Sequence, residues 1–575
     1  VIGIDTGGTF TDGVLLDYRS RDVLASAKTL TTRHDLKEGV IEVIDQLDVK
    51  EPHKVKLVGI SSTLATNSIA EGKTRKVGLL LIGYDQSLIE SYELDKKFAT
   101  DTLAYFAGGH DSQGREKAPL ALEEITAWVE QEKDNVDAFA VSSYFSPLNT
   151  EHEDQVFEAI EKACDIPVVL GHQLSTKLDS VKRATTAALN ASLVAVMQEF
   201  IEAVRFSLDE HESRAPLMIV RGDGTLMPYT EAVQKPVETV ISGPAASAIG
   251  GQFLTNRKNA LVVDIGSTTT DMALVGDGQV VVSRTGARVG DTETAVEAAR
   301  IRTLCIGCDS CIRIDKNGKV SVGPERVVAL SQLGQQYPEV AADITGLRNR
   351  KPETWKARDL VYWFLYKQPE EQTAEQLSDT AQGVVEALLE GPKSLSALMD
   401  DAGVYHPGQL QADELIVQGY IGTAGITPSD LLHVAGHMDM WDEDVARQAV
   451  RCTCHIYNKH RKAFIEETLD LIVAEIVEEM IIFLACQQMP DAEMPYKIDG
   501  RWGRWLFEEM LTGDSPFLSV NIDSRFAVIG TGEPAEFFIR HAAEMLSTPY
   551  ISPPHFEVAN AVGAVSGSVM ETREA

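Results

Sequence analysis

Two short runs of acidic, glycine and hydroxyl residues carry the clearest chemistry in this sequence. They are DTGGTFTD at residues 5–12 and DIGSTTTD at residues 264–271, and both follow the pattern Asp-x-Gly-x-Thr-x-Thr-Asp. Glycine lets backbone N–H groups approach an anion, threonine and serine add hydroxyl donors, and aspartates hold a hydrated divalent cation. Two such turns facing each other would grip a nucleoside triphosphate from both sides.

Each run lies between two apolar segments that must position it. The segments are residues 1–4 and 14–16 around the first run, and residues 261–263 and 272–275 around the second. Short apolar segments on both sides of a glycine-rich turn predict a strand, a tight turn and a second strand. The sequence therefore predicts the same local unit twice, as expected for a duplicated fold.

The rest of the pattern predicts four regions. Alternating strand and helix signals over residues 1–185 predict an N-terminal α/β lobe that contains the first turn. Residues 186–324 are expected to begin a second lobe, which contains the second turn. Residues 325–460 are acidic and predict a mostly helical insertion. Residues 461–575 are expected to complete the second lobe, with a strand that ends in a glycine turn and a terminal helix over residues 558–569.

Composition limits the classes of function. The chain has 575 residues, 44% hydrophobic residues and a formal net charge of −34. This charge argues against nucleic acid as a main partner, because binding to its phosphates needs a basic surface. There is no run of 18 or more uncharged apolar residues and no basic-then-apolar leader. We therefore expect no transmembrane helix and a cytoplasmic location.

The two turns and several further segments resemble the A-type, ATP-using subunit of hydantoinases and 5-oxoprolinases. This family belongs to the actin-like and sugar-kinase-like ATPase superfamily. The further segments are GGHD at residues 108–111, TLATN at 63–67, RATTAALNA at 183–191, SGPAA at 242–246, TPSD at 427–430 and VANAVGA at 558–564. The resemblance implies an α/β fold with two actin-like, ribonuclease-H-like lobes, an ATP cleft between them, and a helical insertion in the second lobe.

The resemblance also implies roles for individual residues. Asp5 and Asp264 would hold Mg²⁺ through water, and they are candidate catalytic residues together with Asp12 and His110. Asp12 and Asp271 would position the turns or a water molecule. The residues expected to bind the nucleotide are Thr6, Gly7, Gly8, Thr9, Gly266, Ser267, Thr268, Asp271, Gly530, Thr531, Gly532 and Glu533, of which the last four resemble an adenosine-contacting strand end.

The chemistry implied by the family is phosphorylation of a carbonyl oxygen in a cyclic amide, such as a hydantoin or an oxoproline-like lactam. A B-type partner subunit usually completes hydrolysis, and a homo-oligomer is the other expected assembly. Two alternatives remain open: a ketone carboxylase subunit, which uses the same activation, and an ATP-driven activator of a partner enzyme that carries a metal or iron–sulfur centre.

The chain departs from the family in two places. Residues 59–63 read GISST where the family usually has histidine and glycine before the threonine. Residues 305–311 read CIGCDSC where the family has a glycine-rich stretch near the substrate region, so the substrate stays open. His110 and Asp111 are candidates for substrate contact or proton transfer, or for a capped turn after two glycines.

Seven cysteines in a chain of this length do not suggest a disulfide scaffold. Cys305, Cys308 and Cys311 have the spacing Cys-x-x-Cys-x-x-Cys, and Cys452 and Cys454 form a second group. Thiols at this spacing suit zinc or an iron–sulfur cluster with a further ligand from elsewhere. The alternative is that three small residues occupy a tight loop.

Overall fold

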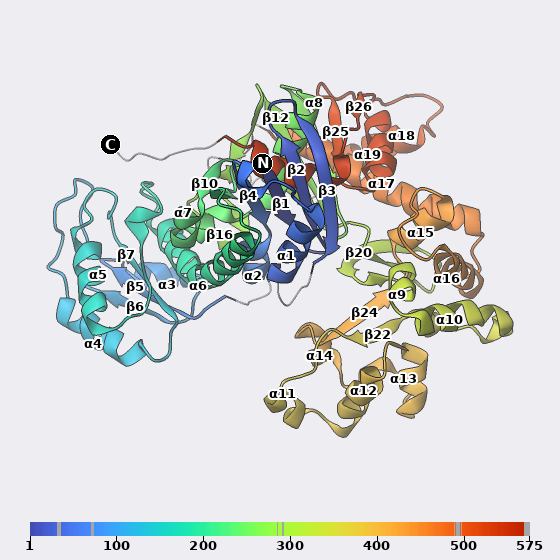
Figure 1. The fold of residues 1–575 in the computed structure, drawn as a ribbon, viewed down its shortest axis with the longest axis horizontal. Helices are drawn as coiled ribbons and strands as arrows, with labels where there is room; N and C mark the ends of the chain where they lie inside the picture. Colours follow the sequence, from blue (N-terminus) through green and yellow to red (C-terminus); the bar gives the residue numbers. More distant parts are fainter. Residues whose placement is uncertain are drawn as a thin grey trace.

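The computed structural model describes residues 1–31, 36–70, 74–283, 286–289, 292–487, 489, 495 and 497–568. Its centre is formed by two mixed sheets that repeat one plan (Figure 1). A separate parallel sheet lies on one side of them, and a mostly helical insertion lies on the other.

The first sheet has the strand order β10-β9-β4-β1-β2-β3. Its strands are β1 (Ile2–Thr6), β2 (Phe10–Asp17), β3 (Asp22–Leu30), β4 (Val58–Ser62), β9 (Leu217–Val220) and β10 (Leu226–Pro228). β1 pairs antiparallel with β2 and parallel with β4, and both β1 and β4 are buried along their whole length. Burial on both faces fits the apolar and glycine residues that begin both strands, whereas their polar ends lie at the site.

The second sheet repeats this arrangement with the order β13-β12-β11-β25-β26. Its strands are β11 (Ala260–Ile265), β12 (Thr270–Gly276), β13 (Gln279–Val280), β25 (Val528–Thr531) and β26 (Tyr550–Ile551), and β18 (Ile301–Leu304) also pairs with β12. In both sheets an antiparallel three-strand meander continues into parallel strands. The expected α/β class, with two related sheets around the two turns, is confirmed.

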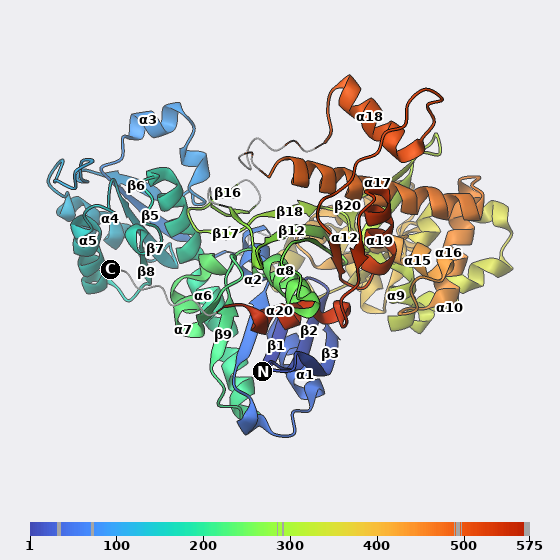
Figure 2. The ribbon, with the colours of Figure 1, turned by 90° about the horizontal axis from the view of Figure 1, so that it is seen from above.

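Two helices made largely of small residues lie between these sheets. They are α8 (Ser242–Thr255) and α20 (Ala559–Ser566), which Figure 2 places at the centre of the molecule. α20 contacts β1 and β4 of the first sheet, whereas α8 contacts β11, β12 and β25 of the second. Small side chains let the two helix backbones approach each other, so the pair joins the two halves directly.

Residues 77–170 build a third sheet of their own, with the order β6-β5-β7-β8 and all strands parallel. The strands are β5 (Val77–Ile82), β6 (Leu103–Phe106), β7 (Ala138–Ser143) and β8 (Val168–Leu170), and the helices beside them include α3 (Gln86–Ser91), α4 (Leu122–Glu132), α5 (Glu151–Ala163) and α6 (Ser180–Glu210). By length and composition α6 could cross a membrane, but 61% of its most apolar window is buried inside the protein. Such burial is typical of a core helix.

These pairings differ from the expected region boundaries. β9 and β10 were expected in the second lobe of residues 186–324, but β9 pairs in parallel with β4 and completes the first sheet. The range 1–185 likewise holds two sheets and not one lobe. A short buried strand carries no local signal of the sheet it joins, and the long helix α6 separates β9 from its partners in the sequence.

The insertion is mostly helical, as expected, and the last region also contains several helices. Their helices are α9 (Leu330–Gln336), α10 (Pro338–Gly346), α11 (Glu371–Gln376), α12 (Asp379–Leu389), α13 (Leu395–Asp401), α14 (Asp413–Val417), α15 (Pro428–Ala435), α16 (Glu443–Ile456), α17 (Arg461–Ala485), α18 (Arg501–Thr512) and α19 (Ala535–Met545). The insertion also contains a small sheet that was not expected, β21 (Val328–Ala329), β24 (Ile421–Gly425), β22 (Tyr362–Leu365) and β23 (Lys393–Ser394). The terminal helix ends at Ser566, and residue 569 lies outside the described residues.

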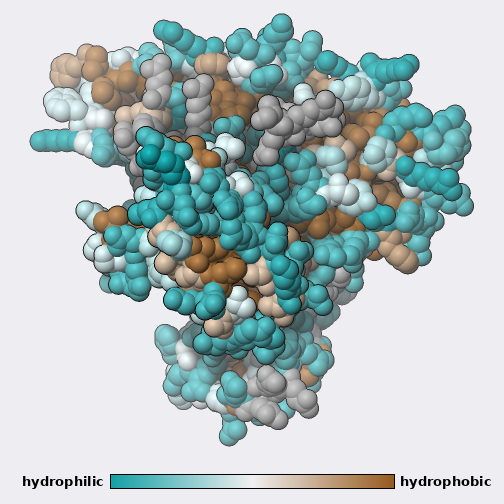
Figure 3. All heavy atoms as spheres, turned by 90° about the vertical axis from the view of Figure 1, so that its left-hand side faces the viewer, coloured by the Kyte–Doolittle hydropathy of each residue, from teal (hydrophilic) through white to brown (hydrophobic). Residues whose placement is uncertain are grey.

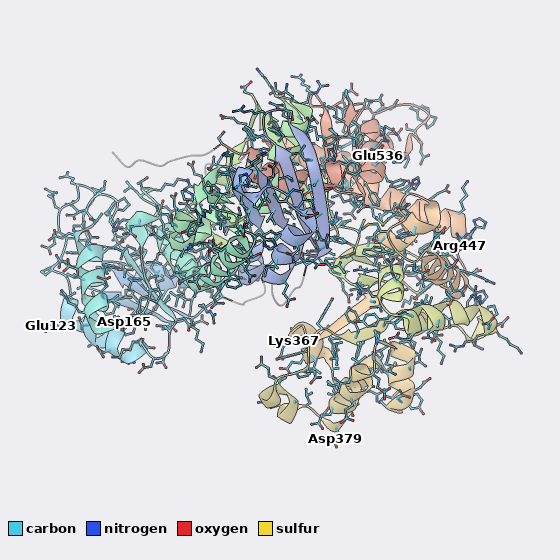
Figure 4. The ribbon with its side chains drawn as sticks, viewed as in Figure 1. Glu123, Asp165, Lys367, Asp379, Arg447 and Glu536 are labelled. Atoms are coloured by element: carbon cyan, nitrogen blue, oxygen red, sulfur yellow. The ribbon has the colours of Figure 1, made fainter. Side chains whose placement is uncertain are left out.

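Charged side chains are spread widely over the surface. Figure 4 shows Glu123 and Asp165 at the edge of the unit built on the third sheet, and Asp379 on the insertion, and all three are exposed. The face shown in Figure 3 is largely hydrophilic, with separate apolar areas between the polar ones. Exposed acidic side chains therefore occur on at least two separate parts of the molecule.

Candidate functional site

The two predicted turns have the same geometry. In the first, Asp5 lies opposite Asp12 in the β1–β2 register, and the Gly7 N–H donates to the Phe10 carbonyl at 3.0 Å. In the second, Asp264 lies opposite Asp271 in β11–β12, and the Gly266 N–H donates to the Thr269 carbonyl at 2.9 Å. Each turn thus carries a pair of aspartates at its base and is closed by a backbone hydrogen bond from its first glycine.

One cleft is lined by both turns. The predicted residues that line it are Asp5, Gly7, Gly8, Thr9, Asp12, Asp264, Gly266, Ser267, Thr268, Asp271, Gly532 and Glu533. Three others, Thr6, Gly530 and Thr531, are buried in strands directly beside these lining residues. The structure therefore brings the two halves of the predicted site together, whereas the role of each residue stays a prediction.

Buried helices hold the two central carboxylates. Asp5 is 3% exposed and accepts hydrogen bonds from the Ser61 hydroxyl and, at 3.2 Å, from Asn560 Nδ2 on α20. Asp264 accepts a hydrogen bond at 2.6 Å from the Ser247 hydroxyl on α8. The helix pair between the sheets thus supplies one positioning hydrogen bond to a carboxylate of each turn.

These residues fit a hydrated magnesium ion. Within the described ranges, no three His, Cys, Asp or Glu side chains converge as a complete metal-ligand set. Magnesium keeps several of its own waters and needs few protein carboxylates, so one aspartate from each turn suits it. The Thr6 hydroxyl is buried in β1 beside Asp5, with no hydrogen-bond partner in the described part of the chain.

Burial makes these carboxylates strong enough bases to bind protons near neutral pH. Desolvation raises the pKa of Asp5 to about 6 and that of Asp12 to about 7, and the nearby acidic residues add to both shifts. Burial likewise raises the pKa of Asp271 to about 6. The carboxylates of the chain alone therefore take up protons as the pH falls through 7 to 6.

We expect Mg²⁺ binding to weaken as the pH falls, because the ion must displace these protons. A carboxylate with a pKa between 6 and 7 lowers the apparent affinity by about tenfold between pH 7.5 and 5.5. Calorimetric titration with Mg-ATP in two buffers of different ionisation enthalpy measures both the affinity and the protons released. A constant affinity across this range, with no proton release, would contradict the assignment of the metal to these carboxylates.

The predicted adenosine end adjoins the second turn. Gly532 has a φ of +84°, and a Cβ at this position would lie 2.2 Å from the Ile265 carbonyl oxygen. Both conditions require glycine. The next residue, Glu533, lines the cleft, and burial raises the pKa of its carboxyl group.

Sequence reasoning missed Lys28, Trp441 and Asn560 as site residues. The β2–β3 register places Lys28 opposite Asp12, where its Nζ lies 3.6 Å from the carboxylate and 4.9 Å from the centre of the Phe10 ring. Trp441 stacks on Phe10 from the insertion, with ring centroids 6.2 Å apart and an interplanar angle of 11°. Strand register places Lys28 at the site, and tertiary packing places Trp441 there, so no local sequence motif marks either residue. Asn560 belongs to the VANAVGA segment, which is the signal that could have identified it.

The cysteines do not form the expected metal centre within the described residues. Cys305 is exposed, Cys311 is partly buried, and only Cys308 of the three lines the cleft. Cys452 and Cys454 are buried in two different hydrophobic clusters. The loop at residues 305–311 instead contacts the second turn through its backbone, since the Cys308 N–H donates to the Gly266 carbonyl at 3.1 Å.

His110, the candidate for substrate contact, proton transfer or a capped turn, is not among the residues that line the cleft. It follows β6 in the third sheet, is 1% exposed, and its ring lies 4.4 Å from that of His152. Burial, with His152, lowers the pKa of His110 and favours a neutral ring. Asp111 is tied to Arg115 in the same turn by hydrogen bonds. The capped-turn alternative fits this geometry.

Two protein-family models match consecutive parts of the chain. The hydantoinase/oxoprolinase N-terminal region matches residues 1–164, and hydantoinase/oxoprolinase matches residues 183–342. These matches cover both turns and the helix α8, but not the helical insertion beyond residue 342.

Two named relatives match part of the chain at 27% sequence identity. The chain is 27% identical over 355 residues to the caprolactamase subunit alpha of Pseudomonas jessenii, which covers 56% of the chain and 50% of that protein. It is 27% identical over 401 residues to the acetophenone carboxylase gamma subunit of Aromatoleum aromaticum, which covers 62% of the chain and 54% of that protein. The chain thus spans about half the length of each of these relatives.

A solved structure supports the fold over nearly the whole chain. The nucleotide-free structure of acetone carboxylase, from a study of ATP-dependent acetone carboxylation, superposes with a TM-score of 0.64 at 14% identity. The superposition covers 99% of this chain and 70% of the other. The insertion, which the sequence families do not cover, is therefore part of a fold that this structure shares.

Proposed function

Because the chain belongs to the hydantoinase/oxoprolinase family, we propose that it is an ATP-dependent enzyme subunit that phosphorylates the carbonyl oxygen of a cyclic amide or a related carbonyl compound. The observation that carries the proposal is the single cleft lined by both Asp-x-Gly-x-Thr-x-Thr-Asp turns. The names of the relatives, a caprolactamase subunit and an acetophenone carboxylase subunit, support lactams and ketones as acceptors.

The proposed roles follow the geometry of the cleft. The Gly7 and Gly266 N–H groups donate within their own turns, which leaves the backbone N–H groups of residues 8–9 and 267–268 to bind the β- and γ-phosphates. Asp5 and Asp264 would hold Mg²⁺ through its water molecules. The metal neutralises charge on the phosphates when it is bound. Lys28, which lines the cleft beside Asp12, adds the positive charge of a protein side chain. Transfer of a phosphoryl group needs this positioning and charge neutralisation more than covalent help.

The reaction itself is a displacement at the γ-phosphorus. The carbonyl oxygen of the acceptor attacks, the bond to the bridging oxygen breaks, and ADP leaves with the bonding electrons. An amide acceptor then loses its N–H proton to solvent and becomes an O-phosphorylated imidate. Water can then add to that carbon, which resonance protects in the free amide. The C–N bond breaks as the nitrogen takes up a proton and leaves as an amine, and a second water hydrolyses the acyl phosphate that remains to carboxylate and phosphate. We propose that a partner subunit catalyses this second step and that both act in the cytoplasm.

ADP formation in a single turnover tests the proposal without the partner. Purified chain with Mg-ATP should form ADP faster when a lactam, a hydantoin or a ketone is added. Formation of ADP at one rate, whatever carbonyl compound is present, would favour an ATP-driven activator of another protein. Failure to bind Mg-ATP would contradict both the carbonyl-phosphorylating enzyme and the ATP-driven activator.

A further inference from the structure

The cleft is strongly acidic for a site that must hold a triphosphate. Among the described residues that line it, Lys28 is the one cation, and it lies beside Asp12. The carboxylates that line it are those of Asp5, Asp12, Asp264, Asp271, Asp309, Glu533 and Glu557. Mg²⁺ and backbone N–H groups neutralise the nucleotide, so the cleft offers little positive charge to a second anionic ligand.

Asp309 occupies a particular place in this cleft. Its N–H donates to the Ser267 carbonyl at 2.7 Å, and the Thr9 hydroxyl donates to its carboxylate at 3.4 Å. It therefore contacts both turns, although Thr9 lies 300 residues before Asp309 in the sequence. Its side chain is buried, with 8% of the residue exposed.

The surrounding contacts fix Asp309 in this position. The Val327 N–H donates to the Asp309 carbonyl at 2.9 Å, and the Ser429 hydroxyl donates to the Cys308 carbonyl at 3.1 Å. Ser429 lies at the start of α15, whose capping box joins Thr427 and Asp430. The loop is thus held from the second turn, from β20 (Val320–Arg326) and its extension, and from the insertion.

The place where the two turns meet is the place for the γ-phosphate, because both turns direct their backbone N–H groups there in the proposed function. An acceptor oxygen must lie about 3–3.5 Å from the phosphorus that it attacks. Asp309 therefore stands beside the acceptor. Apolar and neutral residues complete the lining nearby, among them Phe10, Gln332, Ser429 and Trp441.

We propose that Asp309 makes the subunit selective for neutral carbonyl acceptors and excludes acceptors that carry a carboxylate. This inference rests on the proposed function and narrows its substrate class. A carboxylate brought into this buried place would meet the charge of Asp309 and the phosphates, with Lys28 already beside Asp12. Burying a charge without a partner is strongly unfavourable, and a like charge at short range adds to the cost.

A matched pair of lactams tests the proposal, because 2-pyrrolidone and 5-oxoproline differ only in the carboxylate. Each is titrated into the chain loaded with Mg²⁺ and a non-hydrolysable ATP analogue, and each is also assayed for single-turnover ADP formation. We expect 2-pyrrolidone to bind at least about tenfold more tightly than 5-oxoproline. The variant Asp309→Asn keeps the shape of the side chain, and it should reduce this ratio mainly by binding 5-oxoproline better.

Asp400→Asn provides a control, since Asp400 is an exposed residue of α13 and its replacement changes the net charge by the same amount. It should leave the ratio of the two affinities as in the natural chain. Equal or tighter binding of 5-oxoproline, an unchanged ratio in Asp309→Asn, or no binding of either lactam to the loaded chain would overturn the inference. Nucleotide loading is measured in the same samples, so a loss of Mg-ATP binding would instead identify a failure of the proposed function.

Discussion

Asp5→Asn is expected to weaken Mg-ATP binding by about 100-fold or more while the chain still folds. The change removes one charge beside the metal, and a charge pair at short range in partly buried surroundings is worth several kcal/mol. The amide keeps the volume of the carboxylate and can still accept the hydrogen bond from Ser61. Calorimetric titration gives the affinity, and thermal unfolding without nucleotide checks the fold.

Binding of metal-free ATP by Asp5→Asn separates a metal-linked role of Asp5 from damage to the turn. Without the metal, the Asp5 carboxylate repels the phosphates, so Asp5→Asn should bind metal-free ATP at least as well as the natural chain. Asp22→Asn is the matched control, because Asp22 is an exposed residue of β3. Equal losses with and without Mg²⁺ would indicate damage to the turn and would argue against a metal-linked role for Asp5.

Gly250→Ala is expected to have the largest effect on stability. Gly250 lies inside α8, and a Cβ there would lie 1.8 Å from the Ala559 carbonyl oxygen of α20. The two helix backbones would have to separate, and overpacking of this kind costs about 3 kcal/mol or more. Because α8 and α20 hold Asp264 and Asp5, the variant should also lose affinity for Mg-ATP.

Gly383→Ala is the control for this substitution. Gly383 also lies inside a helix, α12, but a Cβ there would meet no atom within 4 Å. Alanine is a better helix former than glycine by about 0.5–1 kcal/mol, so this variant should be as stable as the natural chain or more stable. Thermal and urea unfolding of both variants, followed by circular dichroism, compares them. Similar midpoints for the two would contradict the close approach of α8 and α20.

The sequence predicted the turns better than their surroundings. Each turn is defined by residues that are adjacent in sequence, namely aspartate, glycine and hydroxyl residues between two apolar strands. In the structure both turns line one cleft. The sheet of β9 depended on long-range pairing and was predicted incorrectly, and no local signal showed that His110 lies in the unit of the third sheet. Local patterns determine which elements form, but the strand that an element pairs with is decided by packing over the whole chain.

The same limit applies to single residues of the site. Lys28 reaches Asp12 through the β2–β3 register, and Trp441 reaches Phe10 from an insertion hundreds of residues away in sequence. The spacing of Cys305, Cys308 and Cys311 suggested a metal, yet the backbone of this loop contacts the second turn and presents Asp309 to the cleft. Spacing alone did not distinguish a ligand set from a tight loop.

Hydrogen exchange of the backbone amides, with and without Mg-ATP, tests most directly whether both turns hold one nucleotide. The account predicts that amides of residues 8–9 and of residues 267–268 become protected together, at one ATP concentration and only with Mg²⁺. Protection of one turn without the other, or of neither at saturating nucleotide, would contradict it.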